Sequence, residues 1–345
     1  MMAILLLNVQ VVICNLNFAF KSIILIFIKN INFSIPDKIQ WIFIVIILAV
    51  SIMFIFPPSF LLMYKFSDYA IHWMLLCLLI GIVSLFIGNE KFLYSCFIST
   101  GILAFFLMNS FNTDLRLTKL NNPASISLLF VNLTFTNDAI DHSLQSIYGL
   151  DPDILVLEEL SPDNIEKLQS TRSRYPYQTM LPRIDPLGKA VLSKFPFYEE
   201  SSFGIFGNPI LNLGLKNQLN DSFKILVSNS LPIETSNSFS KMNQFLDSLC
   251  SKIKKDFPNV ILTANFNLVP WSRELRNFRI KTGLMASRRD NNEGISNAKT
   301  LSIFNTPNNE IFYSRSLECS YFKVLLDSEG NELGLYGRYQ KRVPF

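Results

Sequence analysis

Acidic side chains directly follow a short apolar run in the C-terminal half of the chain, where they could bind a metal or a phosphate. The run Asp153–Leu157 has the composition of a buried strand, and Glu158 and Glu159 come next. A carboxylate at the end of a buried strand is unfavourable unless it is paired or metal-bound. Glu159 is therefore the best candidate for a metal ligand, and a surface acid just past the strand is the alternative. We expect Glu158 to face solvent or to form an ion pair.

Amide side chains end two further apolar runs. Asn132 closes the run that starts at Ile126, and Asn265 and Asn267 follow the run that starts at Val260. Asn132 and Asn267 could bind a ligand or cap neighbouring loops, whereas we expect Asn265 to preserve a hydrogen-bond network. The residues alone leave both interpretations open for Asn132 and Asn267.

Groups that could accept a proton at neutral pH are scarce. The chain has two histidines, His72 in an apolar stretch and His142, and none after residue 142. Histidine is the side chain whose pKa suits proton transfer at neutral pH, whereas asparagine cannot take up a proton under ordinary conditions. Hydrolysis of a phosphodiester needs a base for water, stabilisation of developing charge and a metal clamp. The chain after residue 142 has no histidine that could act as this base.

From Ser125 onward, short apolar runs alternate with segments of helical periodicity, which indicates an α/β sandwich. Residues 285–309 are polar and rich in turn formers, which favours a long loop before two or three final strands. We expect strands at 126–133, 153–157, 190–193, 210–215, 223–228 and 260–263, and helices at 138–150, from 161 onward, at 239–257 and at 272–279.

The order and the sequence motifs of these segments resemble those of the endonuclease/exonuclease/phosphatase family, particularly its bacterial members with an N-terminal anchor of three helices. The stretch DPDILVLEE, which ends at Glu159, is similar to the family's DPDVLVLQE, whose last Glu binds magnesium. The resemblance assigns metal and phosphate contacts to Asn132 and Asn267. It covers about 125–345 and implies a two-sheet α/β sandwich of the DNase I-like type. Further matches lie at Tyr175–Tyr177, Gly188–Pro196, Pro258–Asn267 and Pro270–Ser272.

The same resemblance identifies family groups that are replaced. Ser230 stands where the family has a His, and Asn265 stands where the Asp of its GDFN motif orients the attacking water. The family's IDH strand corresponds to Asn308–Glu310, and its closing SDH motif would fall near Gln340–Arg342. Removing one such group commonly slows a reaction about 10²–10⁴-fold. The resemblance thus implies a magnesium-dependent phosphoester hydrolase with reduced or lost activity. The alternative is a non-catalytic, membrane-tethered binding module on the same fold.

The N-terminal part predicts a membrane anchor at 1–110, joined by a linker at 111–124 to the domain at 125–345. Only 17% of the chain is charged, against about 25% in soluble proteins. Uncharged stretches near 41–60, 69–88 and 92–110 are long enough to cross a bilayer, and the pair Pro57-Pro58 should end the first helix near Phe56. The stretch 3–28 could be a fourth span, an interfacial helix or an upstream extension, and we favour a segment that does not span.

Charge distribution bears on orientation and on partners. Three lysines precede the first firm span, so the positive-inside rule puts that side in the cytoplasm. Three crossings would then leave the C-terminal domain in a bacterial periplasm, and a fourth would reverse this. Residues 1–120 hold seven of the 31 Lys and Arg and four of the 27 Asp and Glu. The remainder is nearly balanced, which argues against a strongly basic nucleic-acid surface. The expected partners are the lipid bilayer and a phosphoester substrate of unknown identity.

Overall fold

The computed structural model describes residues 36–110, 124–133, 149–256, 258–290, 308–326 and 332–342. The chain divides into two compact units. One comprises Met1–Pro58 with Tyr69–Phe106, and the other comprises Ser59–Asp68 with Leu107–Phe345. The segment Ser59–Asp68 therefore belongs with the C-terminal unit, although it lies between two apolar helices in the sequence. The stretch 3–28, most of the linker and His142 lie outside the described residues.

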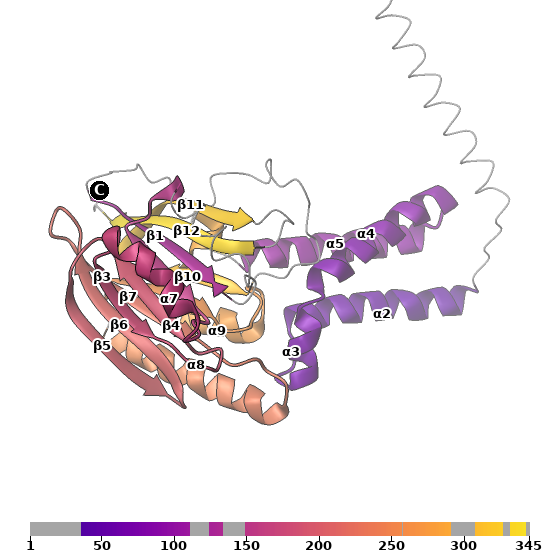
Figure 1. The fold of residues 1–345 in the computed structure, drawn as a ribbon. Coiled ribbons are helices and arrows are strands. Elements are labelled where there is room, and N and C mark those ends of the chain that lie inside the picture. Colours follow the sequence, from indigo (N-terminus) through magenta and orange to yellow (C-terminus); the bar gives the residue numbers. More distant parts are fainter. Residues whose placement is uncertain are drawn as a thin grey trace, which may run out of the picture. The chain divides into compact units, whose positions relative to one another are not determined.

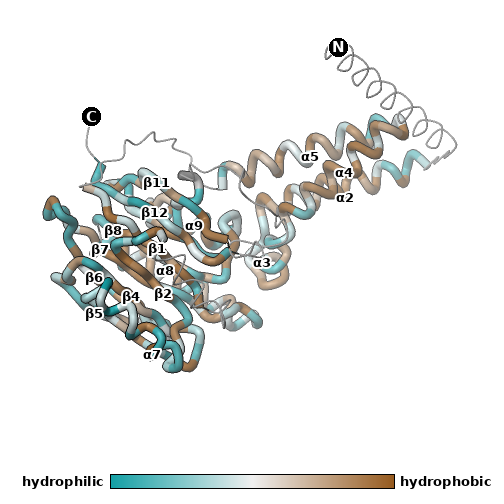
Figure 2. Tube along the Cα trace, turned by 45° about the horizontal axis from the view of Figure 1, so that its top comes forward, coloured by the Kyte–Doolittle hydropathy of each residue, from teal (hydrophilic) through white to brown (hydrophobic). Residues whose placement is uncertain are grey.

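Within the part of the chain that the structure describes, three helices are long and apolar enough to cross a membrane: α2 (Asp37–Ile55), α4 (Ala70–Ile87) and α5 (Glu90–Asn109). Figure 2 shows brown, hydrophobic colour along most of their length. As expected, α2 ends just before Pro57, because proline cannot continue the hydrogen-bond ladder. Contacts between these helices use small or polar side chains, and the Trp73 indole donates to Ser51 Oγ at 3.1 Å.

The C-terminal unit is built on two six-stranded sheets, which confirms the predicted two-sheet α/β sandwich. The first sheet has the order β11-β12-β1-β2-β4-β3, and the second has the order β5-β6-β7-β8-β10-β9. The strands are β1 (Ile126–Asn132), β2 (Ile154–Glu158), β3 (Tyr177–Leu181), β4 (Lys189–Ser193), β5 (Phe197–Ile205), β6 (Asn208–Lys216), β7 (Ser222–Asn229), β8 (Val260–Asn265), β9 (Met285–Ala286), β10 (Asn309–Tyr313), β11 (Leu317–Leu326) and β12 (Glu332–Lys341).

Alternation along each strand sends apolar side chains to two sides. Phe130 and Val156 enter the core between the sheets, together with Val227 of the opposite sheet. Their neighbours face outward and are covered by helices. α8 (Ser236–Asp256) and α9 (Arg273–Thr282) cover the second sheet (Figure 1), and α7 (Asn164–Leu168) with a 3₁₀ turn at Gln169–Ser173 lies over the first. The short helix α3 (Leu61–Ser67) also packs against the outer cluster of the second sheet.

Two strands, β3 and β5, were not predicted. Both lie at sheet edges, where exposed and half-buried side chains replace the continuous apolar run of an inner strand. The expected loop at 285–309 begins with β9 and a 3₁₀ turn at Ser287–Asp290. Of the helix expected at 138–150, the structure describes only its last two residues, which are helical.

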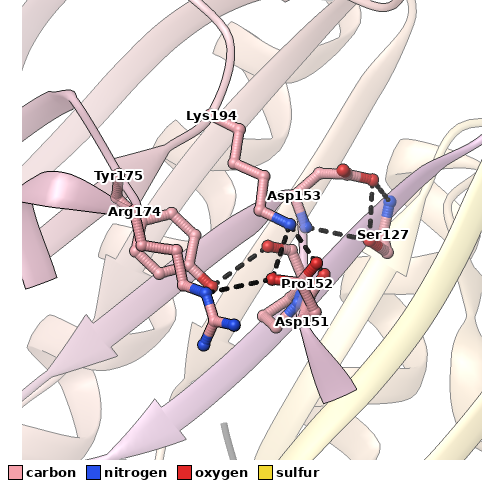
Figure 3. A network of polar contacts seen from close by, with 7 residues as sticks. All are labelled: Ser127, Asp151, Pro152, Asp153, Arg174, Tyr175 and Lys194. Carbon is pink, nitrogen blue, oxygen red and sulfur yellow. Dashed lines mark hydrogen bonds and ion pairs between the residues drawn. The ribbon is translucent and has the colours of Figure 1, made fainter. Parts of the chain in front are cut away.

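A polar network fixes the beginning of β2 against β1 (Figure 3). The Asp153 carboxylate accepts hydrogen bonds from the N–H of Ser127 at 2.8 Å and from its hydroxyl at 2.7 Å. Asp151, with a φ of 47°, pairs through its carboxylate with Lys194 at 2.8 Å and with Arg174 at 3.2 Å. Asp153 therefore fixes the pairing of β1 with β2 at the end remote from Glu159, and Asp151 ties the start of β2 to the residues that follow β4 and the 3₁₀ turn.

The aromatic residues of the next matched segment have separate environments. Tyr175 is fully buried, and its hydroxyl donates to the Pro152 carbonyl at 3.0 Å, which adds a further tie at the start of β2 (Figure 3). Tyr177 is 40% exposed on the edge strand β3. The segment thus contributes to packing at the sandwich edge.

Candidate functional site

Polar side chains gather where several strands of both sheets end or begin. Parallel pairing of β1 with β2 sets Asn132 beside Glu158, and parallel pairing of β7 with β8 sets Asn229 beside Asn265. The antiparallel strand β10 begins at the same end, with Asn309 opposite Asn265. We call this end of the sandwich the mouth. Its polar residues in the described chain include Asn132, Glu158, Glu159, Lys189, Asn229, Ser230, Asn265, Asn267, Arg288, Asn309, Glu310 and Glu332.

Glu159 and Asn132 are brought together as the sequence predicted. Asn132 Nδ2 donates to Glu159 Oε1 at 2.9 Å. Glu159 has a φ of 59° just past β2, and partial burial raises the pKa of its carboxyl, while the hydrogen bond from Asn132 lowers it. The next residue, Leu160, is held by Gly188: a Cβ on that glycine would lie 2.0 Å from the Leu160 carbonyl oxygen. This close approach explains the glycine that opens the matched segment before β4.

Ser230, Asn265 and Asn267 also lie together, where they tie two loops to each other. The N–H of Ser230 donates to the Asn265 carbonyl at 2.9 Å, and the N–H of Asn267 donates to Asn265 Oδ1 at 3.1 Å. Asn267 Nδ2 donates to the Ser230 carbonyl at 2.9 Å, and its backbone has a φ of 53°. Both amides therefore cap loops at the mouth. The Ser230 hydroxyl is buried without a hydrogen-bond partner in the described residues.

The expectation that Glu158 faces solvent or forms an ion pair was wrong. Because it lies two residues after Val156, its side chain points into the sandwich, where it is fully buried and neither carboxyl oxygen has a hydrogen-bond partner among the described residues. Burial raises the pKa of Glu158 to about 8, although the nearby Lys189 opposes the rise. The carboxyl is therefore mostly protonated at neutral pH.

Lys189 and Asn229 join the two sheets beneath the mouth, and neither was predicted as a site residue. Lys189 Nζ donates to Asn229 Oδ1 and to the Pro209 carbonyl, both at 2.6 Å. Asn229 Nδ2 in turn donates to the Pro186 carbonyl at 2.6 Å. Burial lowers the pKa of Lys189 to about 8. The signal in the sequence is the alternation of β4, which puts Lys189 on the same face as the core residue Val191.

A buried arginine binds the acids on the other side of the mouth. Arg288 Nε lies 3.1 Å from Glu310 Oε1, and its Nη2 lies 2.6 Å from Glu332 Oε2. Asn309 Nδ2 donates to Glu332 Oε1 at 3.0 Å. Burial raises the pKa of Glu310 to about 7, against the opposing effect of Arg288. Arg288 is thus engaged by two carboxylates, so its charge is already compensated.

The predicted place of the closing SDH motif, near Gln340–Arg342, was wrong. β12 runs antiparallel to β1, with Tyr339 opposite Ile126 and Gly334 opposite Val131. The beginning of β12 therefore lies at the mouth, and Gln340 and Lys341 lie at the opposite end. The residue of β12 that reaches the mouth is Glu332.

The donor atoms around Glu159 suit a weakly held magnesium ion better than a closed metal site. Glu159 supplies one carboxylate, and Asn132 beside it supplies an amide oxygen. Magnesium in enzymes is often bound by one or two carboxylates, with waters and substrate phosphates as the remaining ligands. The described residues contain no group of three His, Cys, Asp or Glu arranged to hold a metal. The metal prediction at Glu159 remains a prediction.

Substituting Glu158 by Gln should make stability less sensitive to pH. With a pKa of about 8 when folded and an ordinary value of 4.5, Glu158 holds its proton more tightly in the folded protein. Its contribution to stability is complete below pH 4.5 and is lost as the pH rises to 8. Glu158→Gln removes that loss. The difference in melting temperature, variant minus wild type, should therefore be larger at pH 8 than at pH 5 by more than about 2 °C.

The full chain in detergent micelles can be tested by thermal unfolding at several pH values. Glu200→Gln is the matched control, since Glu200 is exposed on β5. A difference for Glu158→Gln that stays constant over this pH range would contradict the assignment of a buried, protonated carboxyl.

Comparison with known proteins identifies the fold. No family model matches the sequence, and no curated protein matches it. Among solved structures, an endonuclease/exonuclease/phosphatase protein from Bacteroides vulgatus has a TM-score of 0.52 and 11% identity, over 63% of this chain and 99% of that one. A protein of the same description from Beutenbergia cavernae has a TM-score of 0.51 and 12% identity, over 63% and 72% of the two chains.

A third similar structure is TDP2 from D. rerio, complexed with a single-strand DNA product. Its TM-score is 0.51 at 12% identity, and the match covers 63% of this chain and all of that chain. At such low identity the likeness bears on the fold alone. The C-terminal domain has the two-sheet fold of the endonuclease/exonuclease/phosphatase proteins, in agreement with the motifs read from the sequence.

Proposed function

We propose that the protein is a membrane-anchored phosphoester-binding protein on the endonuclease/exonuclease/phosphatase fold, in which hydrolytic activity is strongly reduced or lost. The observation that carries this proposal is the state of the acids at the mouth. Glu158 is fully buried, which raises its pKa, and Glu310 and Glu332 are engaged by Arg288. Amides occupy the neighbouring positions where a proton acceptor would be useful.

Proton transfer is the step that this arrangement handles poorly. Water that attacks a phosphoester must lose a proton, and neither Asn265 nor Asn267 can accept it. Glu159 could accept it, but Glu159 is also the carboxylate that a magnesium ion would need. One group cannot serve fully in both roles. When bound at Glu159 and Asn132, magnesium would supply positive charge to phosphate oxygens.

Binding of a phosphoester, unlike its hydrolysis, does not require these residues to accept a proton. The amides of Asn132, Asn265 and Asn267 provide both hydrogen-bond donors and acceptors at one end of the sandwich, and they remain uncharged at any ordinary pH. Such groups can contact phosphate oxygens without a proton-transfer step. The second candidate function, a non-catalytic and membrane-tethered binding module, rests on this property and on the loop-capping hydrogen bonds that keep the amides in place.

We further propose a position on the periplasmic side of a bacterial inner membrane. If α2, α4 and α5 all cross the bilayer, Ser59–Asp68 and the chain after Asn109 lie on one side. This is consistent with their joint membership of the C-terminal unit. The lysines before α2 support a cytoplasmic location for the opposite side.

Alkaline phosphatase fused to the C-terminus of the full chain tests this topology, because that reporter is active only after export. We expect an active fusion and, as a control, an inactive one when the reporter follows Gly88 between α4 and α5. The reverse pattern would contradict the proposed side and would favour an additional crossing before α2.

The activity proposal is tested with the purified full chain in nanodiscs, with magnesium or manganese and bis-p-nitrophenyl phosphate. We expect wild-type turnover no more than about tenfold above that of Glu159→Ala, because the loss of several acid-base groups leaves only metal-assisted background. Glu166→Ala, at an exposed position of α7, is the matched control. Wild-type turnover of 10³-fold or more above Glu159→Ala, with Glu166→Ala unaffected, would overturn the proposal.

A further inference from the structure

The segment between the first two apolar helices contacts the loop that carries Asn267. The Tyr64 hydroxyl, in α3, donates to the Asn267 carbonyl at 2.5 Å. In the opposite direction, the indole N–H of Trp271 donates to the Ser67 carbonyl at 2.8 Å. Two hydrogen bonds of opposite polarity therefore join α3 to residues 266–272, which follow β8.

Apolar packing supports these hydrogen bonds. Leu61 and Tyr64 lie against the outer cluster of the second sheet, and the Tyr64 ring centroid is 5.8 Å from that of Phe239 in α8. Trp271 and Ser67 are both buried. Burial also raises the pKa of the Tyr64 hydroxyl, so it remains a hydrogen-bond donor over the whole physiological range. The Trp271–Ser67 hydrogen bond is thus buried, and the Tyr64–Asn267 hydrogen bond is partly buried.

Three hydrogen bonds to three different residues hold Asn267 in place. Its N–H donates to Asn265 Oδ1, its side-chain amide donates to the Ser230 carbonyl, and its own carbonyl accepts from Tyr64. A non-glycine residue with a φ of 53° is conformationally strained and persists where its surroundings determine it. Tyr64 supplies the hydrogen bond that no residue of the sandwich supplies to that carbonyl in the described structure.

The chain on both sides of α3 leads directly into apolar helices. α2 ends at Ile55 and α4 begins at Ala70, so few residues separate either helix from α3. A second attachment lies after α5, where Arg279 of α9 donates to the Ser110 carbonyl. A displacement of the helix ends can therefore reach the Asn267 loop through a short, packed connection.

We propose that Ser59–Asp68 is a strap through which the membrane helices position Asn267 at the mouth, with Tyr64 as the positioning residue. The strap is part of the C-terminal domain, so that domain is incomplete when it is cut from the anchor. This inference goes beyond the proposed function and holds whether the mouth hydrolyses a phosphoester or only binds one.

Hydrogen exchange of the full chain in nanodiscs, followed by mass spectrometry, tests the proposal. In the wild type, residues 61–67 should be protected well beyond an unstructured loop. Tyr64→Phe keeps the ring and removes the hydroxyl, so exchange at 266–272 should become about fivefold faster, as expected for one net hydrogen bond. Trp271→Phe should accelerate exchange at 61–67 to a similar degree.

The controls separate local from general effects. Tyr177→Phe, at an exposed position of β3, should leave both segments unchanged, and peptides from 197–216 should exchange equally in all variants. Unprotected 61–67 in the wild type would overturn the proposal. It would also be overturned if Tyr64→Phe and Trp271→Phe left both segments unchanged, or accelerated 197–216 as much as these segments.

Discussion

Parallel pairing of two neighbouring strands in each sheet is the constraint on which the rest of the site depends. It makes β1 and β2 end together in one sheet and β7 and β8 end together in the other. Since the two sheets share one core, the last inward-facing residue of each strand arrives at the same end of the sandwich. Lys189 shows that the ends meet, because it reaches from the first sheet to Asn229 of the second.

Among the residues that the structure describes, the mouth is polar, and most of its acids are buried or paired. Of the acids there, Glu158 is buried in a form that favours the proton, and the pair Glu310 and Glu332 shares a buried guanidinium. Glu158 lies out of contact with solvent, and Glu310 and Glu332 are paired with Arg288, so these acids are poorly placed to take a proton from water. Glu159 is the exception, because its partly buried carboxylate accepts a hydrogen bond from Asn132 and is not one of the two carboxylates that pair with Arg288.

Much of this arrangement could be predicted from the sequence, and the remainder depended on contacts between distant segments. Continuous apolar runs identified the inner strands, and the residues that end them identified Asn132, Glu159, Asn265 and Asn267. The edge strands β3 and β5 gave no such run, because one side of each meets water. The environment of Glu158 could not be read from its neighbours alone, since its burial is decided by the face of β2 on which it falls. The SDH motif was placed at the wrong end of β12, because the antiparallel pairing of β12 with β1 is part of the tertiary structure and cannot be read from the local sequence.

The contact of Ser59–Asp68 with the loop after β8 is one that no local sequence pattern indicates. Tyr64 and Asn267 are separated by 203 residues in the chain, and α3 taken alone is only a short helix between two apolar helices. Tyr64 in α3 packs against the outer cluster of the second sheet, which only the folded domain provides. Ser59–Asp68 and the sandwich therefore belong to one compact unit.

The central claim is that the described residues of the mouth offer no proton acceptor besides Glu159, and it is tested most directly by introducing one. The measurement is the single-turnover rate of phosphodiester hydrolysis by the full chain with magnesium, compared between the wild type and the double variant Ser230→His with Asn265→Asp. The account predicts a wild-type rate at background and an increase of about 10²-fold or more in the double variant. Rapid hydrolysis by the wild type that the double variant does not increase would contradict it.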